Sequence, residues 1–273
     1  GACTCGGVPL AIGVQTDMAT PALARIGSPE LQREFLVPAV AGERVACIGV
    51  SEAGAGSDAA AMKLKAVRHN DGWLLNGQKV FTTSAHFADW YWVGARTDPD
   101  AKKHHGISLF LIRMDDPGLT IHPMYTMGAE RTNAVFFDNV FVHDDYRVGD
   151  LNKGFQYIAE ALDIERFSMF TFSPIRGRME LLCDYVKTAK RDGKPLKDDP
   201  VIRQKIAQLT TELEVARVLG VRFVDAALNS TKTPTVEASH YKLYATELSR
   251  RIADATMDIV GPGAQLALRT EDA

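Results

Sequence analysis

The spacing of apolar residues changes twice along the chain and divides it into three parts. Residues 8 to 44 carry apolar positions at helical spacing and are predicted to be helical. Within them, Ser28-Pro29-Glu30 is typical of a helix start, with Ser28 as N-cap and Pro29 at the first helical position. The helix that begins there is expected to end at Val40, just before an Ala-Gly-Glu turn.

From Val45 to residue 148 the period shortens toward two, which favours β-strands. The apolar stretch from Val45 to Val50 comes first, and further strands are expected at 63–67, 73–77, 90–94, 107–112 and 135–142. Turn signals, such as Asn70-Asp71-Gly72, separate them. Several short strands at such intervals predict an antiparallel sandwich or barrel.

After Gly149 the helical spacing returns. One helix is expected over 155–191, with a kink or break at Pro174, and a polar connection then leads to Pro200. Two more long amphipathic helices are expected over 201–228 and 235–260. Long helices with short links indicate an antiparallel bundle.

The expected fold class is therefore α+β. Residues 1–44 would be the end of a helical N-terminal domain, residues 45–149 a middle β-domain, and residues 150–273 an incomplete C-terminal helical bundle. A chain of 273 residues is long enough for about two domains. It opens at Gly1 without an initiator Met and stops just after a Gly/Pro-rich turn, so we expect it to be truncated at both ends.

Composition and charge narrow the class of protein. With 46% apolar and 24% charged residues and a net charge of −3, nothing indicates a nucleic-acid or membrane-surface partner. No apolar run approaches the roughly 18 residues of a membrane span. The cysteines at 3, 5, 47 and 183 lack a second pair at zinc spacing. Without a signal peptide, reduced thiols in a cytoplasmic protein are expected and no metal site, and His104-His105 are expected to be solvated.

The first candidate for chemistry is the segment SEAGAGSD, Ser51 to Asp58, which follows the Val45–Val50 strand. Small residues between polar ones let the backbone approach a ligand, so that its N–H groups can bind a carbonyl or phosphate oxygen. Its spacing is not that of a Rossmann dinucleotide site. From the residues alone, a plain glycine-rich turn is equally compatible.

The second candidate is NGQKVFTTS, from Asn76 to Ser84. Asn-Gly is a hairpin signal, and a strand after it would place Phe81 and Thr83 on one face. A ring and a hydroxyl on one face suit a flat heterocycle, and they suit an ordinary half-buried strand nearly as well.

The third candidate is the helical segment LDIER, from Leu162 to Arg166. Asp163 and Arg166 are three residues apart and share a face, while Glu165 points elsewhere. For an arbitrary helix, a solvated charge cluster with an Asp–Arg pair is the simpler interpretation.

In this order, with GISLFLIRMDDPG and FFDNVFV between the last two, these motifs resemble the acyl-CoA dehydrogenase family over nearly the whole chain. The family pattern reads T-E-P-G-A-G-S-D, N-G-x-K-x-[WF]-I-T-N and F-x-x-V-x-V-P. The resemblance implies a helical N-terminal domain, a middle β-domain and a C-terminal bundle, with FAD bound between the last two. It also implies a homo-oligomer, a dimer or tetramer.

The resemblance assigns the cofactor contacts residue by residue. Ile48, Val50 and Ser51 match the strand that contacts the flavin pyrimidine ring. Gly56 and Ser57 match the loop shared by the pyrophosphate and the CoA tail. Here Ser replaces the usual Thr at 51 and Ala replaces the usual Pro at 53, so the hydroxyl is retained while the loop is less rigid.

The same comparison places Phe81 at the aromatic position that shields the flavin ring and Thr83 at the hydroxyl position near flavin N5. Asp163 and Arg166 match positions that contact the thioester end of the substrate. Glu165 matches the catalytic base of one branch of the family. Most other members place the base in a segment that would lie beyond Ala273.

The last third departs from the family pattern at the cofactor contacts of a neighbouring subunit. The segment 189–196 keeps G-K-P-L and lacks the Arg and Phe that usually precede it. Arg191 would be a substitute or an exposed charge. The turn from Val260 to Gly263 also differs from the usual F-G-G-x. These differences resemble a bacterial subfamily that acts on varied acids.

The implied activity is FAD-dependent α,β-dehydrogenation of an acyl-CoA to the trans-2-enoyl-CoA, as in fatty-acid β-oxidation. A base removes the α-proton, a hydride passes to flavin N5, and an electron-transfer flavoprotein takes the electrons. Two alternatives stay open: an oxidase or monooxygenase on the same fold, and a non-catalytic subunit of a heteromeric dehydrogenase.

Overall fold

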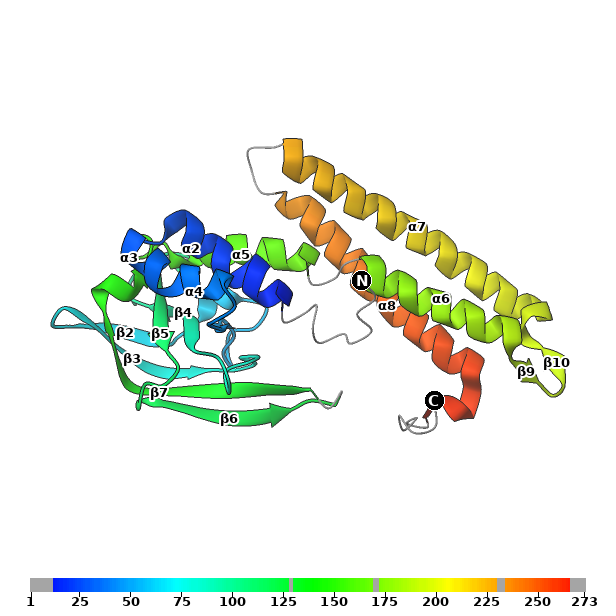
Figure 1. Ribbon diagram of the computed structural model, residues 1–273, viewed down its shortest axis with the longest axis horizontal. Helices are drawn as coiled ribbons and strands as arrows, with labels where there is room; N and C mark the ends of the chain where they lie inside the picture. Colours follow the sequence, from blue (N-terminus) through cyan, green and yellow to red (C-terminus); the bar gives the residue numbers. More distant parts are fainter. Residues whose placement is uncertain (1–11, 128–129, 169–171, 230–233, 266–273) are drawn as a thin grey trace. The chain divides into compact units, whose positions relative to one another are not determined.

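The computed structural model describes residues 12–127, 130–168, 172–229 and 234–265. The chain divides into two compact units, Gly1–Glu165 and Arg166–Ala273. The first contains the sheet and the helices that cover it, and the second contains three long helices (Figure 1).

The first unit begins with short helical segments. The π-helix η1 (Val14–Ala19) continues into α2 (Thr20–Ile26), and α3 (Pro29–Leu31), the π-helix η2 (Gln32–Leu36) and α4 (Val37–Val40) form one continuous stretch. The Ser28 hydroxyl accepts a hydrogen bond from the Leu31 amide at 3.2 Å, so the N-cap expected from the sequence is confirmed.

Eight strands form one sheet in the first unit. They are β1 (Ala46–Gly49), β2 (Lys65–His69), β3 (Gly72–Lys79), β4 (Trp90–Arg96), β5 (Ile107–Arg113), β6 (Leu119–Tyr125), β7 (Arg131–His143) and β8 (Arg147–Val148). The order is β6-β7-β3-β2-β4-β5-β8, and β1 joins at β4. Most pairs are antiparallel, as expected, whereas β1 runs parallel to β4 and β2 meets β4 in a parallel bridge, so the sheet is mixed.

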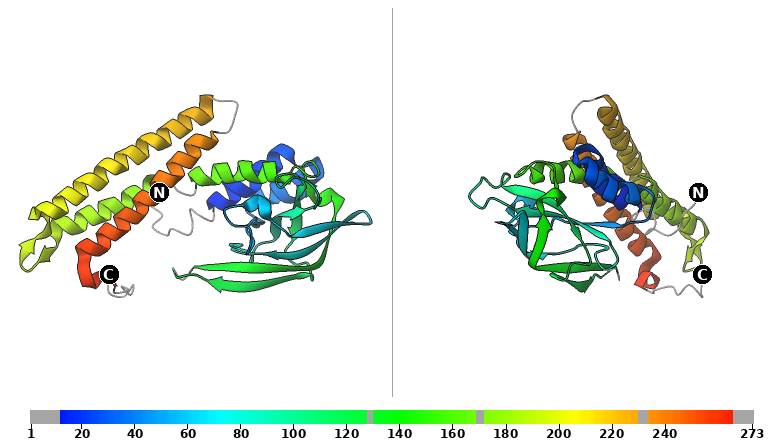
Figure 2. Two further views of the ribbon diagram at one scale, coloured as in Figure 1. Left: turned by 180° about the vertical axis from the view of Figure 1, so that it is seen from behind. Right: turned by 60° about the vertical axis from the view of Figure 1, so that its left-hand side comes forward.

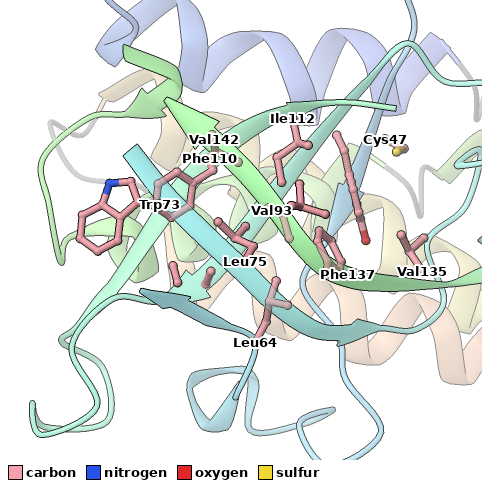
Figure 3. Close-up of a cluster of buried hydrophobic side chains, with 14 of the residues drawn as sticks. Cys47, Leu64, Trp73, Leu75, Val93, Phe110, Ile112, Val135, Phe137 and Val142 are labelled. Atoms are coloured by element: carbon pink, nitrogen blue, oxygen red, sulfur yellow. The ribbon is translucent and has the colours of Figure 1, made fainter. Parts of the chain in front are cut away.

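Strand β4 separates two hydrophobic cores. Tyr91 and Val93 point into a core built between β4–β5 and β3–β7, which Figure 3 shows with Phe110 and Phe137. Trp90 and Trp92 point to the other face, where they pack against the helices before β1 and against α5 (Gly154–Ser168). Because both faces are buried, the strand carries no charged side chain before its last residue, Arg96.

Asn76 and Gly77 lie within β3, so the hairpin turn expected there is wrong. Opposite them β7 bulges at Asn139, whose amide donates to the Asn76 side-chain oxygen at 2.9 Å. Gly77 has φ of 140°, which only glycine adopts readily, and its Cα hydrogen faces Leu64. The dipeptide therefore faces a bulge of β7, and the β2–β3 turn lies at Asn70.

The second unit is built on three helices: α6 (Phe172–Thr188), α7 (Pro200–Asn229) and α8 (Thr235–Val260). They lie side by side in Figures 1 and 2. Between α6 and α7 come a small hairpin of β9 (Lys190–Arg191) and β10 (Lys194–Pro195) and the 3-10 turn η5 (Leu196–Asp198); η6 (Gly261–Gln265) follows α8. Pro174 lies in the first turn of α6, and the break expected near it falls at residues outside the described ranges.

The core of this bundle follows a three-four repeat. On α8 it comprises Ala238, Tyr241, Ala245, Leu248, Ile252, Ala255 and Ile259. This repeat puts all of them on one stripe of the helix, toward α6 and α7. The α+β fold class and the antiparallel bundle expected from the sequence are confirmed. None of the helices in the described ranges combines the length and apolar content needed to cross a bilayer.

Candidate functional site

The loop after β1 is a hydrogen-bonded turn in which Ala55 is buried and the two glycines are exposed. The backbones of Glu52 and Ala55 bond each other in both directions, at 3.1 and 3.0 Å. Among the described residues, and apart from their own chain neighbours, Gly54 and Gly56 have no atom within 4 Å of the place where a Cβ would stand, and Ser57 is exposed. The backbone between Glu52 and Asp58 is therefore open to a ligand on its outer side.

Glu52 holds this loop from inside. Its carboxylate accepts hydrogen bonds from the backbone amides of Lys63, at 2.6 Å, and Leu64, at 3.0 Å. It also accepts one from the ammonium group of Lys79 at 2.8 Å. The Lys79 side chain is 0% exposed and the Glu52 side chain 9%. Burial lowers the pKa of Lys79, and the nearby Glu52 charge opposes that shift.

Lys79 also ties the end of β3 to the end of β1. Its Nζ donates to the Val50 carbonyl at 3.1 Å, and the amide of the next residue, Val80, donates to the Ser51 carbonyl at 2.9 Å. Two segments 29 residues apart in the chain thus share one set of hydrogen bonds. This joins the segment from Ile48 to Ser51 to the one that carries Phe81 and Thr83.

The chain leaves strand geometry immediately after Lys79. Phe81 and Ser84 have φ of 57° and 70°, a left-handed conformation that is unfavourable for residues other than glycine. The strand expected to carry Phe81 and Thr83 on one face is therefore wrong, and a tight turn replaces it. Phe81 is nonetheless 62% exposed, and Thr83 is exposed as well, so the turn presents both side chains outward.

Asn133 on β7 holds the middle of this turn. Its carbonyl accepts from the Thr82 amide, and its side-chain amide donates to the Thr82 carbonyl, both at 2.9 Å. Thr82 and Asn133 are each 0% exposed. Backbone strain of the kind seen at Phe81 persists only where neighbouring contacts over-determine it, and it is common at ligand sites.

An apolar cavity of about 30 Å³ lies beside β1. Its walls include Ile48 of β1, Val50 just after that strand, and Ile158, Ala161 and Leu162 of α5. The helix approaches the sheet closely at Gly94, where a Cβ would stand 2.7 Å from the Ile158 side chain. The helix that carries LDIER therefore borders the strand that precedes SEAGAGSD.

Position 165 falls three residues after Leu162, four after Ala161 and seven after Ile158. Along the backbone of α5, position 165 therefore lies about one helical turn beyond the residues that line the cavity. Its backbone is in α5, and its side chain lies outside the described part of the structure. Asp163, on another face of the helix, is 8% exposed, and Arg166 is half-buried.

The predicted cofactor residues thus lie together in the first unit, on β1, the loop after it and the turn after β3. Sequence analysis missed the side chains that hold them, namely Glu52, Lys79, Thr82 and Asn133. A lysine among apolar residues at the end of a strand, and a glutamate in a loop of small residues, were the available signals.

The other polar candidates serve local structure. His104 packs edge-on against Phe155, with ring centroids 5.0 Å apart. Arg191, in the second unit, donates to the Ile259 carbonyl at the end of α8 at 2.6 Å, and it stabilises that helix end. In the described ranges no three His, Cys, Asp or Glu residues gather as metal ligands.

Comparison with known proteins identifies both parts of the chain. Residues 47–140 match the model "Acyl-CoA dehydrogenase, middle domain", and residues 152–270 match "Acyl-CoA dehydrogenase, C-terminal domain". Acyl-CoA dehydrogenase FadE34 of Mycobacterium tuberculosis is 36% identical over 247 residues, which are 90% of this chain and 34% of the relative. Subunit CarC of the caffeyl-CoA reductase-Etf complex of Acetobacterium woodii is 32% identical, over 86% of this chain and 63% of its own.

The chain thus spans less than two thirds of these relatives. Among solved structures, an acyl-CoA dehydrogenase from Geobacillus kaustophilus superposes with a TM-score of 0.90 at 30% identity, over 96% of this chain and 70% of that one. The family models, the relatives and this structure agree with the resemblance drawn from the motifs. The chain belongs to the acyl-CoA dehydrogenase family.

Proposed function

We propose that the protein containing this chain is an FAD-dependent acyl-CoA dehydrogenase. The observation that carries the proposal is the cavity shared by β1 and α5, because it brings the helix with LDIER beside the strand that leads to SEAGAGSD. When bound, FAD would accept the hydride that leaves Cβ of the acyl group.

The first unit offers a surface that fits a flavin. Ile48, Val50 and Ser51 would contact its pyrimidine ring, and the carbonyls of Val50 and Ser51 are already fixed by Lys79 and Val80. Phe81 presents an exposed ring, as a residue that shields a flat heterocycle must. Thr83 would place its hydroxyl near flavin N5.

The acyl-CoA would be held by the loop after β1 and by α5. Gly56 and Ser57 leave backbone and hydroxyl groups open for the pyrophosphate of the cofactor and the CoA tail. Asp163 and Arg166 would bind the thioester end of the substrate. Hydrogen-bond donors at the thioester oxygen stabilise the enolate charge that develops when the α-proton leaves.

Glu165 would be the base. Its carboxylate would take the α-proton, while Cβ loses a hydride, so that the Cα–Cβ bond becomes the trans double bond of the enoyl-CoA. A carboxylate suits this step if an apolar environment raises its pKa toward neutrality. The apolar walls that α5 shares with β1 support that environment one turn before Glu165.

We further propose that electrons pass to an electron-transfer flavoprotein, that the protein is a homo-oligomer, and that it works in the cytoplasm. The name of the CarC relative supports the first, since that protein belongs to an Etf complex. The other two follow from the family resemblance and the sequence.

Anaerobic titration of the purified full-length protein with a panel of acyl-CoA thioesters tests the proposal. At least one thioester should bleach the flavin absorbance and yield the enoyl-CoA, and the reduced protein should pass its electrons to a dye faster than to oxygen. A protein that never binds flavin would contradict the proposal and would indicate a non-catalytic subunit. Rapid consumption of oxygen would instead indicate an oxidase or monooxygenase.

Glu165→Gln tests the assignment of the base. The variant should bind flavin as before and lose most of its turnover, because an amide cannot take the proton. Glu160→Gln is the matched control: Glu160 lies on the same helix, where it pairs with Arg25 at the surface, and its loss should leave turnover unchanged. Full turnover of Glu165→Gln would place the base elsewhere in the protein.

A further inference from the structure

Tyr91 lies at the centre of the first unit, between the two segments that carry the proposed flavin contacts. It belongs to β4, is 0% exposed, and stacks on Phe137 with ring centroids 5.7 Å apart. Its parallel partner on β1 is Cys47. Burial raises the pKa of Tyr91 well above the usual value, so the phenol stays neutral and can donate a hydrogen bond.

On one side the Tyr91 ring supports β1. A Cβ added at Gly49 would stand 2.3 Å from the Tyr91 hydroxyl oxygen and 2.6 Å from ring carbons, so the ring lies directly against the Gly49 backbone. Gly49, the last residue of β1, separates Ile48 from Val50, which are both proposed to contact the flavin. Only a residue without a side chain allows this approach.

On the other side the Tyr91 hydroxyl reaches the turn after β3. It shares a hydrogen bond of 2.8 Å with the hydroxyl of Thr82, and both groups are buried. Thr82 separates Phe81 from Thr83, the two residues of the turn proposed to contact the flavin. Asn133 already binds the amide and the carbonyl of Thr82. The hydrogen bond to Tyr91 therefore fixes the Thr82 side chain, which the contacts with Asn133 leave free to rotate.

We propose that Tyr91 is a positioning residue that sets the turn of Phe81–Thr83 against β1 and so fixes the shape of the flavin pocket. The inference rests on the proposed function for the ligand, and on the contacts above for the geometry. Tyr91 would not touch the flavin itself. Thr82 is the partner through which it acts.

Four variants of the full-length protein separate positioning from plain stability: Tyr91→Phe, Thr82→Val, the double variant, and Thr82→Ser. Each of the first two leaves one buried hydroxyl without its partner, and the double variant leaves none. A purely structural bond therefore predicts that the single variants melt earlier and that the double variant recovers. Thr82→Ser keeps the hydroxyl and is the conservative control.

The dissociation constant of FAD gives the second readout. If Tyr91 positions the turn, FAD should bind about tenfold more weakly to the double variant, equivalent to about 1.4 kcal/mol, although its melting temperature recovers. Thr82→Ser should bind FAD within about twofold of the unaltered protein, because its hydroxyl is retained. Wild-type affinity in the double variant would overturn the proposal.

Amide hydrogen exchange in the flavin-free protein tests the same geometry without the cofactor. The amide of Thr82, which donates to the Asn133 carbonyl at 2.9 Å, should exchange about tenfold faster in the double variant, while the amides of β4 and β5 keep their protection. Unchanged exchange in the turn would overturn the positioning role. If the unaltered protein binds no FAD at all, the proposed function fails, and the exchange measurement decides on Tyr91 alone.

Discussion

Removing the buried cation at Lys79 gives the sharpest test of how the site is held together. Lys79→Met keeps most of the side-chain volume and deletes three hydrogen bonds, to the Glu52 carboxylate at 2.8 Å, to the Val50 carbonyl at 3.1 Å and to the Met62 sulfur at 3.7 Å. Glu52 then stays buried without its cation, and the Val50 carbonyl loses its donor.

The structure sets the size of the effect. Breaking one side of a buried ion pair costs about 3–5 kcal/mol. Glu52 keeps two backbone donors, from Lys63 and Leu64, which continue to stabilise its charge. We therefore expect the lower end, a loss of about 3 kcal/mol in the free energy of unfolding. Arg25, exposed and paired with Glu160, is the control: Arg25→Met should cost less than about 1 kcal/mol.

Urea denaturation of Lys79→Met, Glu52→Gln and the double variant measures this. The double variant carries no charge at positions 52 and 79. Its loss in the free energy of unfolding should therefore be smaller than the sum of the losses of the single variants, with a coupling of about 1–3 kcal/mol. Losses that simply add, or a cost below about 1 kcal/mol for Lys79→Met, would refute the account of a buried, coupled pair.

The dependence on pH gives an independent check. Burial lowers the pKa of Lys79 below its usual value of 10.5, and Glu52 raises it. In Glu52→Gln the carboxylate charge is gone, and burial still lowers the pKa of Lys79. The folded state then binds the Lys79 proton less well than the unfolded state does, and by a larger margin than in the unaltered protein. The stability of Glu52→Gln should then rise as pH increases from neutrality toward 10.5, and the rise should vanish in the double variant.

Three further predictions concern single positions. Phe81→Gly removes the backbone strain at φ 57°, so the flavin-free protein should be as stable as the unaltered one to within about 1 kcal/mol. FAD should bind more weakly to this variant. A large loss of stability in urea denaturation would contradict this prediction. For Asp144, burial raises the pKa, but the hydrogen bonds from Trp73 and Arg147 lower it by more than burial raises it. The net shift of the pKa is therefore downward. The stability that Asp144 contributes is present above the unfolded pKa of about 3.9 and is lost as pH falls through the folded value. The deficit of Asp144→Asn in thermal melts should therefore shrink below about pH 4, and a constant deficit down to pH 2 would speak against the shift. Ser28→Ala removes the N-cap and should cost about 1 kcal/mol in urea denaturation, with Ser28→Asp restoring it.

The helices of the bundle were predictable because each is long and its apolar stripe is continuous. The helix expected over 235–260 matches α8, and the one expected over 201–228 matches α7 to within a residue at each end. Strands β4 and β5 were predictable because nearly all of their residues are buried, on both faces of the sheet. Strand β6 was missed because only a few of its side chains are partly buried, and its pattern is therefore weak.

The candidate site divides in the same way. Motif order brought Ile48, Val50, Ser51 and the Phe81–Thr83 segment to notice, and the structure gathers them in one unit. The local geometry was not predictable, because the Asn-Gly pair was interpreted as a turn, whereas it lies inside β3 opposite a bulge of β7. Propensity describes a dipeptide in isolation, and a partner strand with an extra residue outweighs it.

Strand β4 is shared by both cores of the first unit, and this limits how the unit can unfold and how it can change. Residues Trp90 and Trp92 leave one core whenever Tyr91 and Val93 leave the other, so the two should be lost in a single cooperative transition. A one-residue insertion in β4 would exchange the two sets of side chains, and both cores would be filled with the wrong shapes. We therefore expect β4 to tolerate substitutions better than insertions or deletions.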